Sequence, residues 1–318
     1  MVETSDEWIR ERTGIGERHV SVGETVVTLA SEAARKALEQ AGKRAEEIDL
    51  ILVATCSPEQ YLPCCACRVQ ADIGAVNALA FDVNAACSGF LFALNTADAY
   101  LRTGLAENAL IIGSEVLSKL VDWTDRSSCI LFGDGAGAVV VEQCETERKT
   151  VDRTPSAGIL GRTLHSDGTG GGVLQCGSRK LITPYATAAV ANTDEKEPGD
   201  GREYYIQMDG QEVYRFAARR VPQCIEEALA DAGLGVADID LFVLHQANAR
   251  IIDTVAKRLH ADRIKFPTNL ERVGNLSSAS IPVLLDELHR QGELHPGDRI
   301  VLAGFGAGLT IGACVITW

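Results

Sequence analysis

Several features are missing from this sequence of 318 residues. No apolar run reaches the length that a membrane-spanning helix needs, and residues 1–8 carry neither the basic nor the apolar segment of a secretory signal. Acidic residues outnumber basic ones, giving a formal net charge of −14, and this argues against general nucleic-acid binding because phosphate contacts need a basic surface. We therefore expect a cytoplasmic protein that binds neither membranes nor nucleic acid.

A disulfide framework is also not expected, although the chain has ten cysteines. Without a secretory signal, they predict free thiols in a reducing compartment. The cluster of Cys64, Cys65 and Cys67 has no second pair at ligand spacing and no nearby histidine, so we expect no metal site. Apolar residues make up 46% of the chain and charged residues 23%, which excludes a disordered protein and indicates a globular one.

An internal repeat is the main organising feature that the sequence does have. Residues 37–54 and 228–245 match without a gap: each has a helical pattern that ends at a glycine, Gly42 or Gly233, followed by a turn and an apolar strand. Each half then continues with a further helix and strand, expected at 88–103 and 109–113 in the first half and at 277–292 and 299–303 in the second. The simplest interpretation is two similar α/β halves packed against each other.

The predicted boundaries are an N-terminal half at 1–150, connecting loops at 151–202 and a C-terminal half at 203–318. We expect the second half to begin with its own strand at 203–208. The first half has no counterpart of that strand, and it opens instead on a helix start near Ser5.

Cys87 lies where an apolar run, 79–83, passes into a helical pattern. A sulfur at a helix N-terminus faces unpaired N–H groups and the positive end of the helix dipole, so we expect its pKa to be lowered and the thiolate to be favoured. The alternative is a buried cysteine without reactivity. Small neighbours favour the nucleophile, because they leave room for a substrate: Ala85, Ala86, Ser88 and Gly89.

Three further stretches are candidates for a site around Cys87. His245 follows the repeated apolar strand, at the strand end where α/β folds place ligand-facing groups, and histidine can donate or accept a proton near neutral pH. Asn275 lies in a turn before a helix of small residues, and the loop 304–308 has glycines whose N–H groups could stabilise an oxyanion. The alternatives are a histidine bonded at a strand edge and an asparagine that only caps its helix. For the similar stretch 132–137 we favour a tight, packed turn.

These stretches form five motifs in a fixed order: Asn84-Ala-Ala-Cys87-Ser-Gly-Phe90, Phe132-Gly-Asp-Gly-Ala-Gly137, His245-Gln-Ala-Asn248, Gly274-Asn275 with its serine-rich helix, and Phe305-Gly-Ala-Gly308. Together they resemble the β-ketoacyl-acyl-carrier-protein synthase III family, and Ser5-Asp-Glu-Trp8-Ile with Arg12-Thr-Gly-Ile15 is similar to the opening of that family. The resemblance covers essentially the whole chain. It implies an α/β, thiolase-like fold, in which two duplicated α/β halves pack as a layered sandwich with the site between them.

Two departures from the family accompany the resemblance. Its members start with a strand and loop upstream of the segment that begins at Ser5, and this sequence has none. We expect that first strand to lie inside the first sheet, where its absence would leave backbone groups unpaired between neighbouring strands. Leu276 and Ile311 stand where a threonine and a tryptophan are usual, which affects the shape of the site and not its chemistry.

By resemblance, Cys87 is the nucleophile that takes an acyl group from acyl-coenzyme A. His245 and Asn275 hold the thioester carbonyl of malonyl-acyl carrier protein and stabilise the enolate that forms as carbon dioxide leaves. Backbone N–H groups of Cys87 and Ala307 meet the oxyanion. The resemblance implies no metal and no cofactor, since the coenzyme A thioester is a substrate.

The resemblance also assigns binding residues. The coenzyme A site is expected to contain one aromatic ring and three polar side chains: Trp8, Arg12, Arg126 and Asn248. Charge, and not the resemblance, suggests where the carrier protein docks: on so acidic a chain, a local basic face on the helix after His245 suits an acidic carrier protein, and its residues are Arg250, Lys257 and Arg258. Leu62 is expected to close the acyl pocket across the interface of a homodimer. Without the resemblance, Trp8 would more simply be interpreted as a core aromatic. Arg126 and the basic residues of the helix would be interpreted as solvated surface charges.

The predicted function is therefore an acyltransferase reaction that initiates type II fatty acid biosynthesis. An acyl-coenzyme A primer, such as acetyl-coenzyme A, would condense with malonyl-acyl carrier protein through an acyl-cysteine. Two alternatives stay open: a related condensing enzyme of secondary metabolism, and a truncated, inactive thiolase-fold protein that only binds a partner. The residues of the site favour an enzyme, and the absent strand favours the inactive protein.

Overall fold

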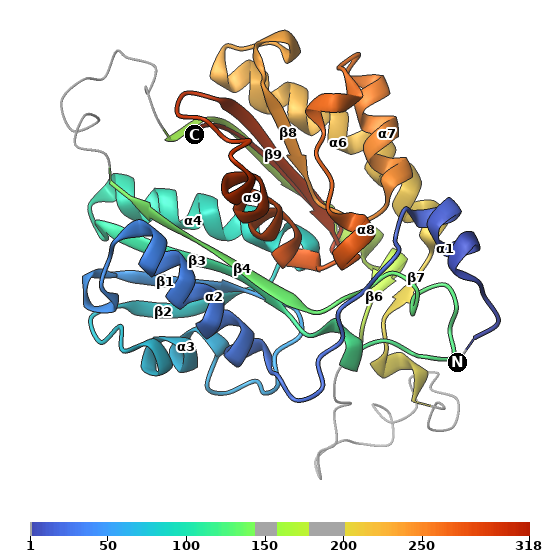
Figure 1. The fold of residues 1–318 in the computed structure, drawn as a ribbon, viewed down its shortest axis with the longest axis horizontal. Helices are drawn as coiled ribbons and strands as arrows, with labels where there is room; N and C mark the ends of the chain where they lie inside the picture. The colour runs from blue at the N-terminus through green and yellow to red at the C-terminus, as the bar shows by residue number, and fades with distance from the viewer. Residues whose placement is uncertain (1, 144–157, 178–200) are drawn as a thin grey trace, which may run out of the picture.

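The computed structural model describes residues 2–143, 158–177 and 201–318, and it contains two four-stranded sheets with helices packed on them (Figure 1). The first half consists of α1 (Asp6–Thr13), α2 (Val26–Ala41), β1 (Leu50–Ala54), α3 (Cys65–Ile73), β2 (Leu79–Val83), α4 (Gly89–Thr103), β3 (Asn108–Glu115) and β4 (Gly135–Glu142). The second half consists of β5 (Gly158–Ser166), β6 (Leu174–Gln175), β7 (Gln207–Met208), α6 (Gly210–Ala232), β8 (Leu241–Leu244), α7 (Ala249–Arg258), α8 (Leu270–Val273), α9 (Ser280–Gln291), β9 (Arg299–Gly306) and β10 (Thr310–Thr317).

The two sheets share the arrangement of three of their four strands. The first has the order β2-β1-β3-β4, in which β1 is parallel to β2 and β3, and β4 is antiparallel to β3. The second has the order β5-β10-β9-β8, in which β8 and β9 are parallel and β10 is antiparallel to both of its neighbours. The series β1-β3-β4 and β8-β9-β10 correspond, which confirms the two similar α/β halves that the repeat predicted.

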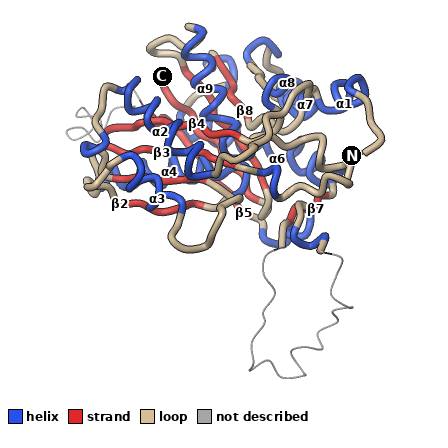
Figure 2. The backbone as a smooth tube through the Cα atoms, turned by 60° about the horizontal axis from the view of Figure 1, so that its bottom comes forward, coloured by secondary structure: helices blue, strands red, loops and turns tan. Residues whose placement is uncertain are grey.

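The helices and sheets form five layers. α4 and α9 lie between the sheets, and their apolar side chains form one core with residues from both sheets, including Leu52 of β1 and Leu302 of β9 (Figure 1). α2 and α3 pack on the outer face of the first sheet, and α6 and α7 pack on the outer face of the second (Figure 2). β1 is buried at every position, as expected for a parallel strand covered on both faces. The layered sandwich expected from the resemblance is thus the observed architecture.

The repeated helix ends follow from local sequence. α2 is followed by Gly42 and α6 by Gly233, with φ angles of 64° and 66°. In this left-handed region a residue with a side chain costs roughly 1–2 kcal/mol, so glycine is favoured there. Both helices are followed by a short 3-10 turn and then by β1 or β8, as the matching stretches predicted.

The expected start of the second half is wrong. Residues 203–208 do not form the first strand of its sheet: the stretch begins inside a 3-10 helix, and β7 is two residues long and pairs with β6. The first strand is instead β5, which lies within the predicted connecting loops and pairs with β10. The apolar and aromatic residues of 203–208 suit a strand, but the place in the sheet is already filled by β5.

The expected gap inside the first sheet is also wrong. β1 and β3 are hydrogen-bonded neighbours, so no backbone groups are unpaired between them. The second half shows where the corresponding strand belongs, because β5 lies at the edge of its sheet against β10. The equivalent edge of the first sheet is the outer side of β4, where a groove of about 470 Å³ lies between α2 and α9. Among the described residues, β4 pairs with β3 only.

None of the helices in the described part of the chain combines the length and the apolar character that crossing a membrane requires.

The nine cysteines within that part are all free thiols. Cys65 opens α3, where its N–H and that of Ala66 donate to the carboxylate of Asp82 at 2.9 and 2.7 Å. The same ranges contain no group of three or more His, Cys, Asp or Glu side chains arranged as a metal site.

Candidate active site

A cavity of about 1220 Å³ is lined by residues of both halves. Cys87 of the first half and His245 and Asn275 of the second half all line it. Folding therefore brings to one cavity the three predicted catalytic residues, which are far apart in the sequence.

Cys87 lies in the 3-10 turn Ala86–Ser88, here called the cysteine turn, which leads directly into α4. Ala86 has a φ angle of 46°, a conformation that L-residues rarely adopt. The side-chain oxygen of Asn84 accepts a hydrogen bond from the Ala86 N–H at 3.2 Å and so supports this backbone. The position of Cys87 at a helix N-terminus is as predicted.

The pKa of Cys87, however, is shifted in the direction opposite to the predicted one. The residue is only 8% exposed, and burial raises the pKa of the thiol to about 12. A hydrogen bond with the Ser277 hydroxyl lowers this pKa, and the charge of Glu115 raises it. A backbone hydrogen bond at Cys87 also lowers the pKa, but burial has the largest effect. Without a ligand, Cys87 is therefore a thiol, and it must lose its proton when the substrate binds or reacts.

His245 directly follows β8, and its N–H donates to the carbonyl of Ala303 at 2.8 Å. The ring is buried and meets the ring of Phe305 edge-on, with 5.5 Å between centroids. Burial lowers the pKa of His245 to about 3, so the imidazole is neutral at pH 7 and has one N–H donor. Among the described residues, Nδ1 has no hydrogen-bond partner. An unsatisfied buried nitrogen in a residue that lines a cavity suits a ligand-binding role better than a purely structural one.

Asn275 is held by backbone hydrogen bonds to the segment that precedes β4. Its N–H donates to the carbonyl of Leu131 at 2.9 Å, and its carbonyl accepts from the N–H of Gly133 at 3.0 Å. Its side-chain oxygen accepts from the N–H of Ser277 at 2.8 Å, so the Nδ2 group of the amide is the end left to donate to a ligand. The stretch 132–137 is therefore more than the packed turn we favoured, because it positions Asn275.

The end of β9 lies against the cysteine turn. A Cβ atom on Gly306 would lie 2.6 Å from the backbone nitrogen of Cys87, so a side chain here would displace the turn. Ala307 is the next residue, and its carbonyl accepts from the hydroxyl of Thr310 at 3.0 Å. The predicted oxyanion donors, the N–H groups of Cys87 and Ala307, thus belong to two segments that meet here, and their role stays a prediction.

The predicted coenzyme A residues surround one aromatic ring at the cavity wall. The guanidinium carbons of Arg126 and Arg12 lie 4.8 and 5.8 Å from the centroid of the Trp8 ring, and all three residues line the cavity. Asn248, which also lines the cavity, caps α7 by accepting from the N–H of Arg250 at 2.9 Å and donates to the carbonyl of Arg12 at 3.3 Å. Trp8 is thus half-buried: it packs against a small apolar cluster that includes Ile9 and also lines the cavity, and its binding role stays a prediction.

The basic residues of α7 divide into two groups. Arg250 lines the cavity and donates to the carbonyl of Glu11 at 3.0 Å. Lys257 and Arg258 are exposed in the last turn of the same helix. The predicted docking face therefore runs from the cavity along α7.

Leu62 is 85% exposed and does not line the cavity of a single chain. Its neighbour Tyr61 is 68% exposed, and at β2, the edge strand of the first sheet, Leu79 is 52% exposed. The prediction that Leu62 closes the acyl pocket across a dimer interface is not tested by one chain.

One wall of the cavity was not expected from the sequence. It is formed by β6, β7 and the start of α6, and its members include Leu174, Gln207, Met208 and Tyr214. These residues form no motif, and the aromatic stretch that precedes β7 suggested a strand of the sheet. Glu115, at the end of β3, was also not singled out, because an isolated acidic residue after an apolar strand gives no signal of its contacts.

Two family models match the chain. The model of 3-oxoacyl-(acyl-carrier-protein) synthase III matches residues 81–168, and the model of its C-terminal part matches residues 229–318. β-Ketoacyl-(acyl-carrier-protein) synthase III of Clostridium acetobutylicum is 46% identical over 318 residues, which are 100% of this chain and 92% of that protein.

Solved structures agree. The crystal structure of 3-oxoacyl-(acyl-carrier-protein) synthase III from Aquifex aeolicus has a TM-score of 0.88 and 39% identity, covering 100% of this chain and 92% of the other. The priming β-ketosynthase of the R1128 polyketide biosynthetic pathway has a TM-score of 0.86 and 36% identity, covering 99% of this chain and 89% of the other. With this likeness over its whole length, the chain belongs to the 3-oxoacyl-(acyl-carrier-protein) synthase III family.

Proposed function

We propose that this protein is an acyltransferase that condenses an acyl-coenzyme A primer with malonyl-acyl carrier protein and so starts fatty acid chains. The observation that carries the proposal is the shared cavity of Cys87, His245 and Asn275. A buried thiol, a neutral imidazole and a primary amide at one cavity suit acyl transfer followed by decarboxylative condensation, because the thiol can hold the acyl group while two donors bind a second carbonyl.

In the first step, the sulfur of Cys87 attacks the thioester carbonyl of the primer. A carbon–sulfur bond to Cys87 forms, the bond to coenzyme A breaks, and the thiol proton leaves on the sulfur of coenzyme A. Because the pKa of Cys87 is about 12 without a ligand, deprotonation must accompany substrate binding or attack. The N–H groups of Cys87 and Ala307 would stabilise the oxyanion between these events.

In the second step, His245 and Asn275 donate hydrogen bonds to the thioester carbonyl of the malonyl group. Loss of carbon dioxide leaves its electron pair as an enolate, whose oxygen is more negative than the original carbonyl. Donors aimed at that oxygen therefore stabilise the transition state more than the bound substrate. The carbanion attacks the acyl-cysteine, Cys87 leaves as a thiolate, and the β-ketoacyl product stays on the carrier protein. The proposed chemistry uses side-chain and backbone groups without a metal or redox cofactor.

The substrates would bind along the wall that contains Trp8 and α7. Stacking between Arg126 and Trp8 leaves a flat aromatic and cationic surface that suits an adenine ring and phosphates, with Arg12 and Asn248 beside it. Arg250, Lys257 and Arg258 give this acidic protein a local basic face that suits an acidic carrier protein.

A homodimer in the cytoplasm is the proposed state of the enzyme. The exposed apolar side chains of Leu62 and Tyr61 would be covered at its interface. Chain-length preference would then depend in part on the partner subunit, since Leu62 lies outside the cavity of its own chain.

Intact-mass spectrometry after mixing with acetyl-coenzyme A tests the proposal. The protein should gain one acetyl group, and Cys87→Ser should prevent this gain. A protein that only binds a partner would gain none. If the acetyl group appears on another residue, the assignment of the nucleophile is wrong.

A condensing enzyme of secondary metabolism is the second candidate, and the likeness to the R1128 priming ketosynthase supports it. The two candidates share the chemistry and differ in the primer. A panel of acyl-coenzyme A primers of increasing length, each followed by malonyl-acyl carrier protein, separates them.

A further inference from the structure

Glu115 is a buried carboxylate that the proposed chemistry does not use. It is the last residue of β3 and is 0% exposed. An isolated buried charge is costly, so such a group persists only where hydrogen bonds satisfy it. Its bonding partners come from both halves of the molecule.

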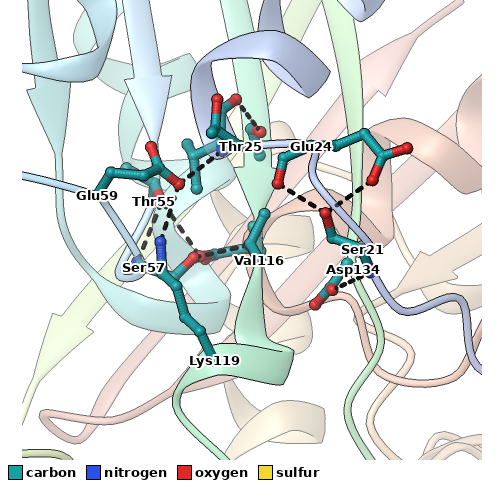
Figure 3. A network of polar contacts seen from close by, with 12 residues as sticks. Ser21, Glu24, Thr25, Thr55, Ser57, Glu59, Val116, Lys119 and Asp134 are labelled. Atoms are coloured by element: carbon teal, nitrogen blue, oxygen red, sulfur yellow. Dashed lines mark hydrogen bonds and ion pairs between the residues drawn. The ribbon is translucent and has the colours of Figure 1, made fainter.

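The first half supplies donors from the segment that follows β1. The hydroxyl of Ser57 donates to Oε2 at 2.5 Å, the hydroxyl of Thr55 lies 3.2 Å from the same oxygen, and the N–H of Cys56 lies 3.2–3.3 Å from both oxygens. Ser57 is itself fixed, because its oxygen accepts from the N–H of Val116 at 2.9 Å (Figure 3). These bonds hold the carboxylate in one orientation.

The second half supplies one donor, and it comes from the turn beside Asn275. Ser278 belongs to the 3-10 turn Ser277–Ala279, here called the serine turn, and its Oγ lies 2.9 Å from Oε1 of Glu115 and 2.8 Å from the carbonyl oxygen of Ala54, so two acceptors of the first half share one hydroxyl proton. The backbone of this turn also touches β3, since a Cβ atom on Gly113 would lie 2.4 Å from the carbonyl oxygen of Ser278. The last residues of β3 thus contact the serine turn in two ways: the backbone of Gly113 packs closely against it, and the carboxylate of Glu115 accepts a hydrogen bond from it.

The serine turn in turn fixes the catalytic amide. The side-chain oxygen of Asn275 accepts from the Ser277 N–H at 2.8 Å, which determines which end of the amide is left for a ligand. A movement of the turn therefore moves Asn275. Misplacement of a catalytic group by about 1 Å can cost on the order of 10²-fold in rate.

We propose that Glu115 is a positioning residue for the decarboxylation step: its carboxylate anchors the serine turn to the first half and so keeps the Asn275 amide aimed at the malonyl carbonyl. This inference rests on the proposed function. Glu115 acts on the chemistry through Ser278 and Asn275. The same charge is one cause of the raised pKa of Cys87, after burial, and this gives the proposal a second measurable consequence.

The test measures the two steps of the reaction separately in two variants and one control. Glu115→Gln keeps the side-chain volume but removes the charge and one acceptor oxygen. Ser278→Ala removes the contacts of the hydroxyl with Glu115 and with the carbonyl of Ala54 while keeping the charge. Acetylation of Cys87 is followed by intact mass, and release of carbon dioxide from malonyl-acyl carrier protein is measured separately. We expect both variants to acetylate within about threefold of the unchanged protein and to lose decarboxylation by about ten- to a hundredfold.

Glu59→Gln is the matched control. Glu59 accepts from the N–H of Val26 at 2.8 Å and from Lys119 at 2.9 Å near the start of α2, so it is a carboxylate of the same region that does not hold the serine turn (Figure 3). It should lower the melting temperature without changing the ratio of the two rates.

The pH dependence of Cys87 alkylation by iodoacetamide is the second measurement. Glu115→Gln should shift it to lower pH, because a negative charge that raises the thiol pKa is gone, whereas Ser278→Ala should leave it unchanged.

The proposal is overturned if the folded Glu115→Gln and Ser278→Ala variants decarboxylate normally, or if both steps fall together as a general loss of stability would cause. Should Glu115→Gln fail to fold, Ser278→Ala alone decides the matter. A failure of the proposed function is a different result, since the unchanged protein would then not acetylate Cys87.

Discussion

The cysteine turn before α4 and the serine turn before α9 occupy equivalent places in the two halves. Ala86 and Ser277 open them with φ angles of 46° and 49°, and in each case the side-chain oxygen of an asparagine two residues earlier accepts from that residue's N–H. Cys87 and Ser278 then stand at matching positions, each just before the helix that lies between the sheets. The repeat therefore extends to the conformation of the turns.

The strand that faces each turn shows how the halves differ. β9 ends at Gly306 against the cysteine turn, whereas β3 ends at Glu115 against the serine turn. The glycine leaves Cys87 beside an open cavity, and the carboxylate occupies the corresponding place beside Ser278. The same backbone arrangement thus has two outcomes. Where the strand ends in Gly306, the cysteine turn is left beside the cavity, and where it ends in Glu115, the serine turn is bound by a carboxylate.

The largest expected effect separates the two steps of the proposed reaction. His245→Ala and Asn275→Ala each remove one donor to the malonyl carbonyl and should lower the rate of decarboxylation by roughly 10²–10³-fold. Acetylation of Cys87 should stay within a few-fold, because that step uses the cysteine turn. Cys87→Ser should show the reverse pattern, with no acyl-enzyme and continued release of carbon dioxide. Equal loss of both steps in every variant would contradict the division of labour.

Adding one methyl group at Gly306 or at Gly113, in the strands that face the two turns, tests the close approaches. In Gly306→Ala the new Cβ would lie 2.6 Å from the nitrogen of Cys87, and in Gly113→Ala it would lie 2.4 Å from the carbonyl oxygen of Ser278. Each should lower the free energy of unfolding by about 1–3 kcal/mol, measured by urea denaturation. Gly306→Ala should impair acetylation first and Gly113→Ala decarboxylation first. Gly23→Ala, where no atom lies within 4 Å of the new Cβ, is the control and should be near neutral.

The raised pKa of Cys87 predicts a steep dependence on pH. Alkylation of the ligand-free protein by iodoacetamide should rise about tenfold per pH unit from pH 7 to 10 without a plateau, because the reactive thiolate is a minor species below a pKa of about 12. A plateau near pH 7 would show a lowered pKa.

The raised pKa of Cys87 also makes the free energy of unfolding depend on pH. The pKa of the folded thiol lies above its ordinary value of 9.0, so its contribution to the free energy of unfolding is fully present below pH 9 and is lost as the pH rises toward 12. Measured against Cys87→Ala, the unchanged protein should lose relative stability above pH 9.

The smallest expected effect concerns the sheet edges. β10 is paired on both sides, with β5 and β9, whereas among the described residues β4 is paired on one side, with β3. Outward-facing amides of β4 should therefore exchange hydrogen with solvent faster than those of β10, which hydrogen–deuterium exchange with mass spectrometry can resolve. Equal protection of the two strands would mean that the outer edge of β4 is covered.

Local patterns in the sequence were sufficient to predict the repeated helix–turn–strand units. Gly42 and Gly233 mark the helix ends, the apolar runs mark β1 and β8, and the small residues around Cys87 mark a turn into a helix. Each of these features depends on residues close together in the chain. The ordered motifs extended this to the family and to the three residues predicted to be catalytic.

The sequence by itself thus determined the two α/β halves and the family, and it singled out Cys87, His245 and Asn275, which line one cavity. Only the tertiary structure decided that β5 fills the edge of the second sheet, that the pKa of Cys87 rises, and that Glu115 binds the serine turn. The reason is physical: edge pairing, loss of solvation and a hydrogen bond between residues 115 and 278 depend on which segments meet in space, and local periodicity carries no information about such contacts.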